Sequence, residues 1–487
     1  MAEDCRKRRK LSNPKKHDES TTVPSIVNEI DIISTLPDCL LCHILSFLPN
    51  TTSVVATTSL LSRRWRYLWK DLQTFHFKQS SFIHDSGSQY YYIAKSSLMD
   101  SAKTFLSLRT TRGFRKFHLN CAMDEQELST VNSWVETAIG SNLEELQLLL
   151  FVKGKRNLVI PSAIFNSTTL VTLRLGTFGE AVMVLNCSSY HLPSLKNFSL
   201  VIDSSKNLEA LLSGCPVLET LNLSINHKCP VPKLFHKSIP KKKETIRVVS
   251  SSLKRLTIRA CYQGTIIEEL EIDASSLEYL YLTVSGKLEE LSARNLHKVE
   301  TADLNFSGAG GGYSLMELVE EIRNASDLSL SPSRMGLVAM PIRDAMDFNH
   351  LQQLTVEYFD TTVVMDILEK CHALRDLKFF WHQRDRLPWR EPMDVPNCLT
   401  SHLKSVSFFM DYGSKKDREF ITYILEEGLI LKSVKIWVLE SERGRDSVRE
   451  VLSLVRRRSR MCQLDIELVT SSEASRLGTR HRTASGR

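Results

Sequence analysis

A short apolar pattern recurs along this chain of 487 residues, in thirteen copies between residues 114 and 436. Each copy reads φ-x-x-φ-x-φ, in which φ is an apolar residue, as in Leu143/Leu146/Leu148. Successive copies begin 22 to 29 residues apart, except for one interval of 35 residues. The copies begin at Phe114, Leu143, Leu170, Leu195, Leu218, Leu253, Leu277, Val299, Ala325, Leu351, Leu374, Leu403 and Leu431.

The last two apolar residues of each copy predict a short strand with one buried face. Side chains alternate across a strand, so these two point the same way and the residue between them points to the opposite face. A unit of this length cannot bury its apolar face alone, and successive units therefore stack into a curved solenoid. Segments 208–213 and 363–371 are typical of helices on its convex side. We expect an α/β solenoid, because strands of a β-sandwich would recur about every ten residues.

Two stretches between the repeats predict loops. The interval of 35 residues carries Pro230-Val-Pro232 and Lys241-Lys-Lys243, which we expect in a loop that leaves the solenoid edge. Gly308-Ala-Gly-Gly-Gly312 indicates a second loop. It lacks the Lys-Ser/Thr that ends a Walker A loop, which argues against a phosphate site.

Before the repeats, residues 36–69 predict three short helices. Pro37 suits the first turn of a helix, and Asp38 favours the positive helix end. Thr51 or Thr52 can cap the second helix. Five apolar residues of the first helix recur at the spacing of one helix face: Leu40, Leu41, Ile44, Leu45 and Leu48.

The third helix, which Ser62 can cap, places Trp65, Leu68 and Trp69 on one face. Helices this short cannot bury so many large apolar side chains among themselves. Some of this apolar surface must therefore meet another chain or the next domain.

This N-terminal segment resembles an F-box. The resemblance rests on the Leu36-Pro37 start, the leucine-rich helix after it, and the Ser62-Arg-Arg-Trp65 ending with Trp69. It implies docking onto the small Skp-type adaptor of a cullin-based ubiquitin ligase, for which the chain would choose the protein to be ubiquitinated. The implied adaptor-binding residues are Leu36, Pro37, Ile44, Leu45, Leu48, Val55, Trp65 and Trp69.

The rest of the chain resembles two further modules of plant F-box proteins. The repeats are similar to leucine-rich repeats, and segments 213–221 and 370–377 look like the variant of plant F-box proteins. The block that begins at residues 387–404 resembles an FBD module. Its expected pattern of strand, helix, strand, helix, strand can extend the solenoid and close its open end.

These interpretations divide the chain into six parts. We expect a disordered basic tail (1–27), the F-box (28–77), a linker or helical connection (78–112), the leucine-rich repeats (113–386), the FBD module (387–468) and a disordered tail (469–487).

The excess charge of the chain lies at its two ends. The formal net charge is +7. Residues 1–16 carry seven basic side chains against two acidic ones, and residues 473–487 carry four against one, so the remainder sums to −1. Such a body is a poor match for a phosphate backbone, and we expect no nucleic-acid partner. The basic residues near the N-terminus resemble a nuclear localisation signal, which favours a nuclear or cytoplasmic protein: Lys7, Arg8, Arg9, Lys10, Lys15 and Lys16.

Nothing in the sequence indicates a membrane or an exported protein. No apolar run approaches the length of a membrane span, and we expect an intracellular chain whose eleven cysteines are free thiols. Cys39-Leu-Leu-Cys-His43 matches the haem attachment motif, but that chemistry requires export. No second cysteine or histidine pair follows at zinc-ligand spacing. We therefore expect neither a cofactor nor a metal.

The favoured function is that of a non-catalytic substrate receptor in an SCF-type ubiquitin ligase. The repeats and the FBD module would hold the target protein. No catalytic grouping has a supporting motif, although folding alone can assemble a triad. A nucleic-acid-associated nuclear protein and an F-box scaffold outside ubiquitination are the alternatives. We predict that Leu45→Asp abolishes adaptor binding, because it would bury an unpaired carboxylate in an apolar interface.

Overall fold

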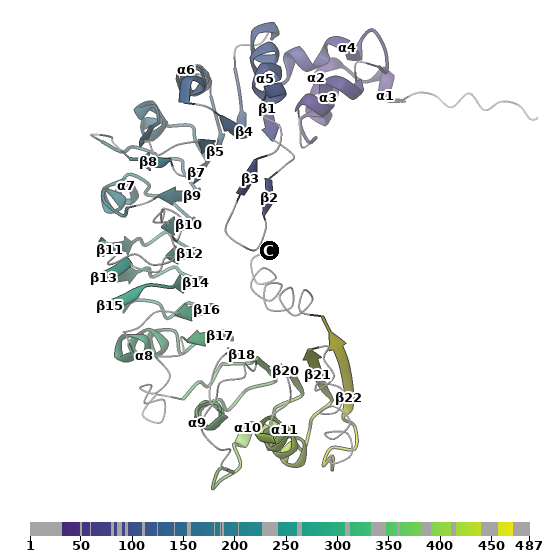
Figure 1. Ribbon diagram of the computed structural model, residues 1–487, viewed down its shortest axis with the longest axis vertical. Helices are drawn as coiled ribbons and strands as arrows, with labels where there is room; N and C mark the ends of the chain where they lie inside the picture. Colours follow the sequence, from purple (N-terminus) through teal and green to yellow (C-terminus); the bar gives the residue numbers. More distant parts are fainter. Residues whose placement is uncertain are drawn as a thin grey trace, which may run out of the picture.

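A computed structural model shows an arch of strands with helices along its outer side (Figure 1). The strands of the long sheet lie side by side along the inner side, from β1 near the N-terminal helices to β22 at the other end. The structure describes residues 32–48, 51–58, 60–78, 82–84, 90–92, 96–109, 113–123, 125–140, 142–152, 157–179, 181–185, 187, 189–202, 204–225, 242–260, 265–306, 312–332, 347–357, 361–380, 391–410, 415–439 and 456–470.

The long sheet has fifteen strands, and each pairs in parallel with its neighbours. In order, they are β1 (Thr74–Lys78), β4 (Lys116–Met123), β5 (Glu145–Val152), β7 (Thr172–Gly179), β9 (Asn197–Ile202), β10 (Thr220–Ile225), β12 (Arg255–Ala260), β14 (Tyr279–Val284), β16 (Thr301–Phe306), β17 (Asp327–Pro332), β18 (Gln353–Glu357), β19 (Asp376–Phe380), β20 (Ser405–Met410), β21 (Ser433–Leu439) and β22 (Gln463–Val469).

The repeat pattern predicts this sheet residue by residue. The last two apolar residues of all thirteen copies lie on its strands and stand in register, and the first one precedes the strand. Leu146, for example, lies opposite Leu173, and Leu148 lies opposite Leu175. Along β5 every second side chain is buried, as the alternation of a strand with one covered face requires. The predicted α/β solenoid is confirmed.

Helices cover the convex side of the sheet (Figure 1). They include both helices predicted from sequence, which are α7 and α9. Residues spaced by three or four face the sheet, as in α6, where Val131, Val135 and Ala138 are buried. The helices from residue 96 onward are α5 (Ser96–Leu108), α6 (Leu128–Ile139), α7 (Leu208–Ser213), α8 (Gly312–Glu321), α9 (Thr361–Lys370), α10 (Asn397–Ser401) and α11 (Lys415–Glu427), with 3-10 turns η2 (Glu125–Glu127) and η3 (Ser162–Asn166).

Three smaller sheets complete the described architecture. The largest joins β11 (Lys242–Val249), β13 (Thr265–Asp273) and β15 (Lys287–Arg294) in parallel. The others pair β6 (Asn157–Val159) with β8 (Val182–Val184) and β2 (Phe82–His84) with β3 (Tyr90–Tyr92).

The three-stranded sheet corrects one expectation. Lys242 and Lys243 belong to strand β11 rather than to a loop, because the alternation of Ile246 and Val248 gives β11 a buried face. Residues 226–241 lie outside the described part of the chain.

Several other expectations also fall partly or wholly outside the described residues. These are the two tails, the glycine-rich loop before Gly312, and the second helix of the FBD block, between β21 and β22. The long sheet begins at Thr74, within the range expected for the F-box. Among the described helices, none is both long and apolar enough to cross a membrane.

Candidate docking surface

The N-terminal helices are α1 (Ile32–Thr35), α2 (Asp38–Leu45), α3 (Thr51–Thr58) and α4 (Trp65–Leu68), with the 3-10 turn η1 (Trp69–Asp71). The predicted start of the first main helix is confirmed, since Pro37 directly precedes α2 and Asp38 lies in its first turn. Ser62 accepts a hydrogen bond on Oγ from the Trp65 N–H at 3.5 Å. Thr51 has another role, because its Oγ1 accepts the N–H of His76 on β1 at 2.8 Å.

Arg64 ties the first two helices together. Its Nε donates to Asp38 Oδ1 at 2.6 Å, and its Nη1 donates to the carbonyl oxygen of Ser34 at 2.7 Å. Its Nη2 donates to the carbonyl oxygen of Leu36. The planar guanidinium group thus fixes the turn between α1 and α2 at both ends.

The inner face of these helices belongs to the core of this chain. Leu41 and Leu45 on α2 are buried, as are Trp65 and Trp69. The Trp69 ring lies 5.2 Å from the ring of Phe105 on α5. Three predicted adaptor-binding residues, Leu45, Trp65 and Trp69, therefore pack inward in this chain.

The outer face of the same helices is apolar and exposed. Eighteen large apolar side chains are exposed in the described part of the chain, and half of them lie between residues 32 and 67. We call this set the N-terminal apolar patch. It consists of Ile32, Ile33, Leu40, Ile44, Phe47, Leu48, Leu60, Leu61 and Tyr67. An exposed apolar concentration of this kind is typical of a protein interaction site.

Cys39 and Cys42, the two cysteines of the haem-like motif, both lie on α2 but differ in exposure. Cys42 Sγ donates to the carbonyl oxygen of Leu68 at 3.5 Å, and burial raises the pKa of this thiol to about 11. Cys39 is exposed on α2. Within the described residues, no three His, Cys, Asp or Glu side chains gather as a metal site would require.

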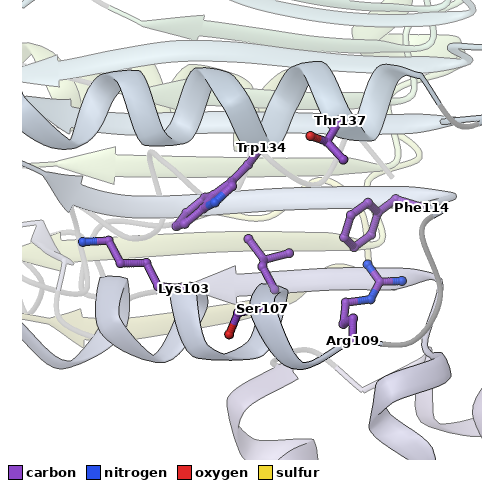
Figure 2. A pocket seen from close by; sticks show the side chains of 7 residues that line it. Lys103, Ser107, Arg109, Phe114, Trp134 and Thr137 are labelled. Atoms are coloured by element: carbon purple, nitrogen blue, oxygen red, sulfur yellow. The ribbon is translucent and has the colours of Figure 1, made fainter.

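A pocket of about 470 Å³ lies between α5 and α6, next to the N-terminal helices. Figure 2 shows Trp134 and Thr137 above Lys103 and Ser107, with Arg109 next to Phe114. The Arg109 guanidinium stacks at 3.7 Å from the Phe114 ring centroid.

Arg109 links the N-terminal helices to the solenoid. Its Nη2 donates to the carbonyl oxygens of Leu72 at 2.6 Å and Gly113 at 3.0 Å, and burial lowers its pKa to about 10. Because this cation already serves the chain's own backbone, its presence beside the pocket does not by itself indicate an anion site.

The concave face carries a mixed set of side chains. At the N-terminal end, the rings of His76 and His118 stack at 4.3 Å, and Glu145 Oε2 lies 3.4 Å from His118 Nε2. Burial, together with the neighbouring His76, lowers the pKa of His118 to about 4. In the middle, Arg259 lies over the Tyr281 ring at 4.7 Å. The N-terminal and central parts of this face therefore combine ionisable and aromatic groups.

The far end of the concave face is aromatic. Phe380 on β19 stacks with Phe409 on β20 at 6.0 Å between ring centroids, and Trp437 packs beside them. Trp437 Nε1 donates to Glu467 Oε2 at 2.9 Å. This end of the concave face therefore places aromatic rings beside a carboxylate.

Comparison with known proteins places these features in one family. A model of the F-box domain matches residues 33–77, and a model of the LRR repeats of FBD-associated F-box protein At5g56370 matches residues 131–303. A model of the FBD matches residues 391–436. F-box/LRR-repeat protein At4g14096 of Arabidopsis thaliana is 30% identical over 426 residues, which cover 81% of this chain and 85% of that protein.

The chain belongs to the F-box/FBD/LRR-repeat family of plants. Two further relatives from Arabidopsis thaliana carry related names. F-box/FBD/LRR-repeat protein At4g00160 is 28% identical over 471 residues, covering 91% of this chain and 96% of the relative. FBD-associated F-box protein At4g10400 is 27% identical over 418 residues, covering 84% and 92%.

The structure sorts the predicted F-box residues into three groups. Pro37, Ile44 and Leu48 are exposed, and Leu36 and Val55 are partly buried. The other three, Leu45, Trp65 and Trp69, are in the core. Ile44 and Leu48 belong to the N-terminal apolar patch, and the remaining exposed members of that patch are absent from the predicted set.

Part of this difference was readable in the F-box sequence. Leu40, Ile44 and Leu48 are spaced by four, and Phe47 lies on the same side of the helix, whereas Leu41 and Leu45 form a neighbouring row. Helical spacing separates the two rows but does not say which one faces the core. Leu60, Leu61 and Tyr67 lie around the third helix and carry no comparable spacing signal.

Proposed function

We propose that this chain is the substrate-recognition subunit of an SCF-type ubiquitin ligase. The F-box would bind a Skp-type adaptor, and through it a cullin, while the LRR and FBD region would hold the target protein. The observation that carries this proposal is the N-terminal apolar patch on an F-box whose inner face is already occupied by this chain's own core.

The patch can supply the energy of a stable complex. Burying one fully exposed leucine or isoleucine side chain contributes roughly 1.5–3 kcal/mol. Ile44 is 47% exposed and Phe47 is 73% exposed, so both have apolar area to lose on binding. A few such anchors at the centre of an interface carry most of its affinity. No step of chemistry is assigned to the chain, because a receptor acts by holding its target close to the charged conjugating enzyme.

The test uses a plant Skp-type adaptor and the variant Ile44→Asp. A buried unpaired carboxylate costs at least about 3 kcal/mol, so we expect a loss of roughly a hundredfold in affinity by calorimetry. Val159→Asp is the matched control, since Val159 is 53% exposed on β6 and far from the F-box in sequence. Equal binding by the wild type and Ile44→Asp would reject this surface as the adaptor site.

Leu45→Asp is a less selective variant than the sequence suggests. Leu45 is buried among the F-box helices, so a carboxylate there would destabilise this chain before any adaptor is added. Loss of binding by that variant would report unfolding as readily as a lost contact.

The concave face favours a protein target over nucleic acid. Lys116 pairs with Glu145, Arg174 lies close enough to His118 to act on its charge, and Asp303 lies two strands from Arg259. Mixed charges of this kind suit a protein surface better than a continuous phosphate backbone. DNA affinity that survives removal of residues 1–16 would support the alternative, a nucleic-acid-associated scaffold.

We further propose nuclear import through the basic N-terminal residues. Lys7–Lys10 and Lys15–Lys16 form two basic groups of the kind that import receptors bind. Replacing all six residues with alanine in a fluorescent fusion should shift the protein toward the cytoplasm. An unchanged nuclear fraction would remove this role from the segment.

A further inference from the structure

The concave face of the long sheet changes sign along the arch. The side chains that alternate onto this face from β1 to β14 are mostly basic where they are charged, with Glu145 as the one acid. From β16 to β22 acids outnumber bases. The bases of the first half are Lys78, Lys116, Arg174, Arg255 and Arg259; the second half has the acids Asp303, Asp327, Glu357, Asp376, Asp465 and Glu467 and the bases Lys378 and Lys435. The half at the FBD end therefore favours a basic partner.

Part of this acidic half is covered. Ser331 on β17 is 5% exposed, whereas Ser199 on β9 and Ser224 on β10, which face the same side, are only partly buried. All three serines belong to strands with a neighbouring strand on each side, so the sheet itself does not account for the difference. Ser331 is therefore covered by more than the strands beside it.

The covered positions form a path across neighbouring strands. Phe380, Phe409 and Val469 pack together on β19, β20 and the last residue of β22. Glu357 on β18 lies opposite Phe380 in the sheet. We call this path the covered strip, and it consists of Asp303, Ser331, Glu357, Phe380, Phe409 and Val469. It begins where the chain leaves β22 and runs back to β16.

Two carboxylates lie within the covered strip. Asp303 is 5% exposed and Glu357 is 7% exposed. A carboxylate at this depth is stable only where cations or hydrogen-bond donors face it. An arginine-rich segment supplies both, because each guanidinium group carries a permanent charge and five N–H donors.

The segment that follows β22 has the charge and the reach to supply them. Residues 471–487 carry four arginines against one glutamate. Neighbouring strands are about 4.8 Å apart, which places Glu357 about 19 Å and Asp303 about 29 Å from β22 along the sheet. An extended chain advances about 3.3 Å per residue, so Arg476 and Arg480 reach about 23 Å and 36 Å beyond the end of β22. We propose that residues 471–487 bind along the covered strip, with arginines facing Asp303 and Glu357.

This contact makes the C-terminal segment a competitor for the concave face. A target held by the FBD end of that face has to displace residues 471–487 first. This consequence rests on the proposed function, in which the LRR and FBD region holds the target. The contact itself requires neither an adaptor nor a target.

The first experiment measures how fast a maleimide labels a cysteine placed in the covered strip. Ser331→Cys is compared in the full-length chain with its natural C-terminal segment and with Arg476→Glu, Arg480→Glu and Arg482→Glu combined. Peptide mass spectrometry should show labelling at least about tenfold faster in the chain with the three glutamates, because like charges release the segment. Ser224→Cys, on the same face but outside the strip, is the matched control and should label equally in both chains.

Two labelling results would overturn the proposal. Slow labelling of Ser331→Cys in both chains would assign the cover to another segment. Labelling of Ser331→Cys as fast as Ser224→Cys in the presence of the natural segment would show that the strip is open. Thermal unfolding of the compared chains establishes that they share one fold.

A peptide added in trans tests the two carboxylates. A fluorescent peptide of residues 471–487 is titrated by anisotropy into the full-length chain that carries the three glutamates. Combining Asp303→Asn with Glu357→Gln in that chain should weaken binding at least about tenfold, whereas Glu317→Gln, exposed on the convex helix α8, should not.

Absence of peptide binding, or equal binding by all of these chains, would also overturn the proposal. Neither experiment contains an adaptor or a target. A failure of the proposed function would therefore leave both results unchanged, and the two hypotheses fail separately.

Discussion

The two ends of the long sheet differ in how they are finished. At the N-terminal end, β1 is covered by the F-box helices: Thr51 accepts the N–H of His76, and Phe75 and Phe77 are fully buried. At the other end, β22 keeps an open edge in the described structure, and its core-facing side chains are only partly buried. The F-box helices thus cover the first strand of the sheet. The exposed apolar side chains at this end therefore lie on helices and not on a strand edge.

This difference means that the two ends expose different chemical groups. The N-terminal apolar patch offers side chains on helices whose backbone is already hydrogen-bonded, so a partner must match its shape. The β22 edge offers backbone groups, which any extended segment of suitable side-chain pattern can pair with.

The largest expected contrast concerns stability. Phe75→Ala should lower the free energy of unfolding by about 3–5 kcal/mol, because Phe75 is fully buried among the rings of Phe77, Phe105 and Phe117. Leu464→Ala on the partly covered β22 should cost less than half as much. Urea unfolding of both variants measures the contrast, and equal losses would show that the two ends are equally well packed.

A smaller effect is expected where the F-box meets β1. Thr51→Val keeps the shape of the side chain but removes the acceptor of the His76 N–H. Losing this hydrogen bond should cost about 1–2 kcal/mol of unfolding free energy. Thr104→Val on α5 is the control, since Thr104 is exposed and its Oγ1 donates to the Asp100 carbonyl oxygen of the same helix at 2.8 Å. A Thr51→Val variant as stable as the control would show that the hydrogen bond does not hold the cap.

The last expected effect is a pH dependence at the N-terminal end. The pKa of His118 falls from an ordinary value of about 6.5 to about 4, because burial and the stacked His76 disfavour its charged form. The unfolded chain therefore binds more protons between these two values, and stability should decline as the pH falls from about 6.5 to about 4. His118→Gln should flatten that decline in thermal unfolding. An unchanged slope would assign the pH dependence to other groups.

Much of the fold could be predicted because its information is local. Each strand of the repeats carries its own φ-x-x-φ-x-φ pattern, and the stacking of equal units fixes the register, as Leu146 opposite Leu173 shows. Two further copies, Leu72/Phe75/Phe77 and Met461/Leu464/Ile466, have the same pattern. They mark β1 and β22, and extending the count to them would have located both ends of the sheet.

The candidate site was less predictable because burial is decided over long distances. Leu41 and Leu40 are neighbours in a leucine-rich helix, yet one is fully buried and the other is 47% exposed. The choice depends on where α4 and the turn η1 pack against α2, and the local sequence of α2 does not specify either position. The same holds for Trp65 and Trp69, because the F-box motif alone does not distinguish a core residue from a contact residue.

The sequence by itself determined the order of the modules, the strands of the repeats and the three main F-box helices, because periodicity and capping act over a few residues. Only the tertiary structure decided which helix face remains exposed, that β11, β13 and β15 form a separate sheet, and that β22 ends the long sheet with an open edge. These outcomes depend on surfaces that meet only after folding, since an apolar residue is buried or exposed according to what packs against it.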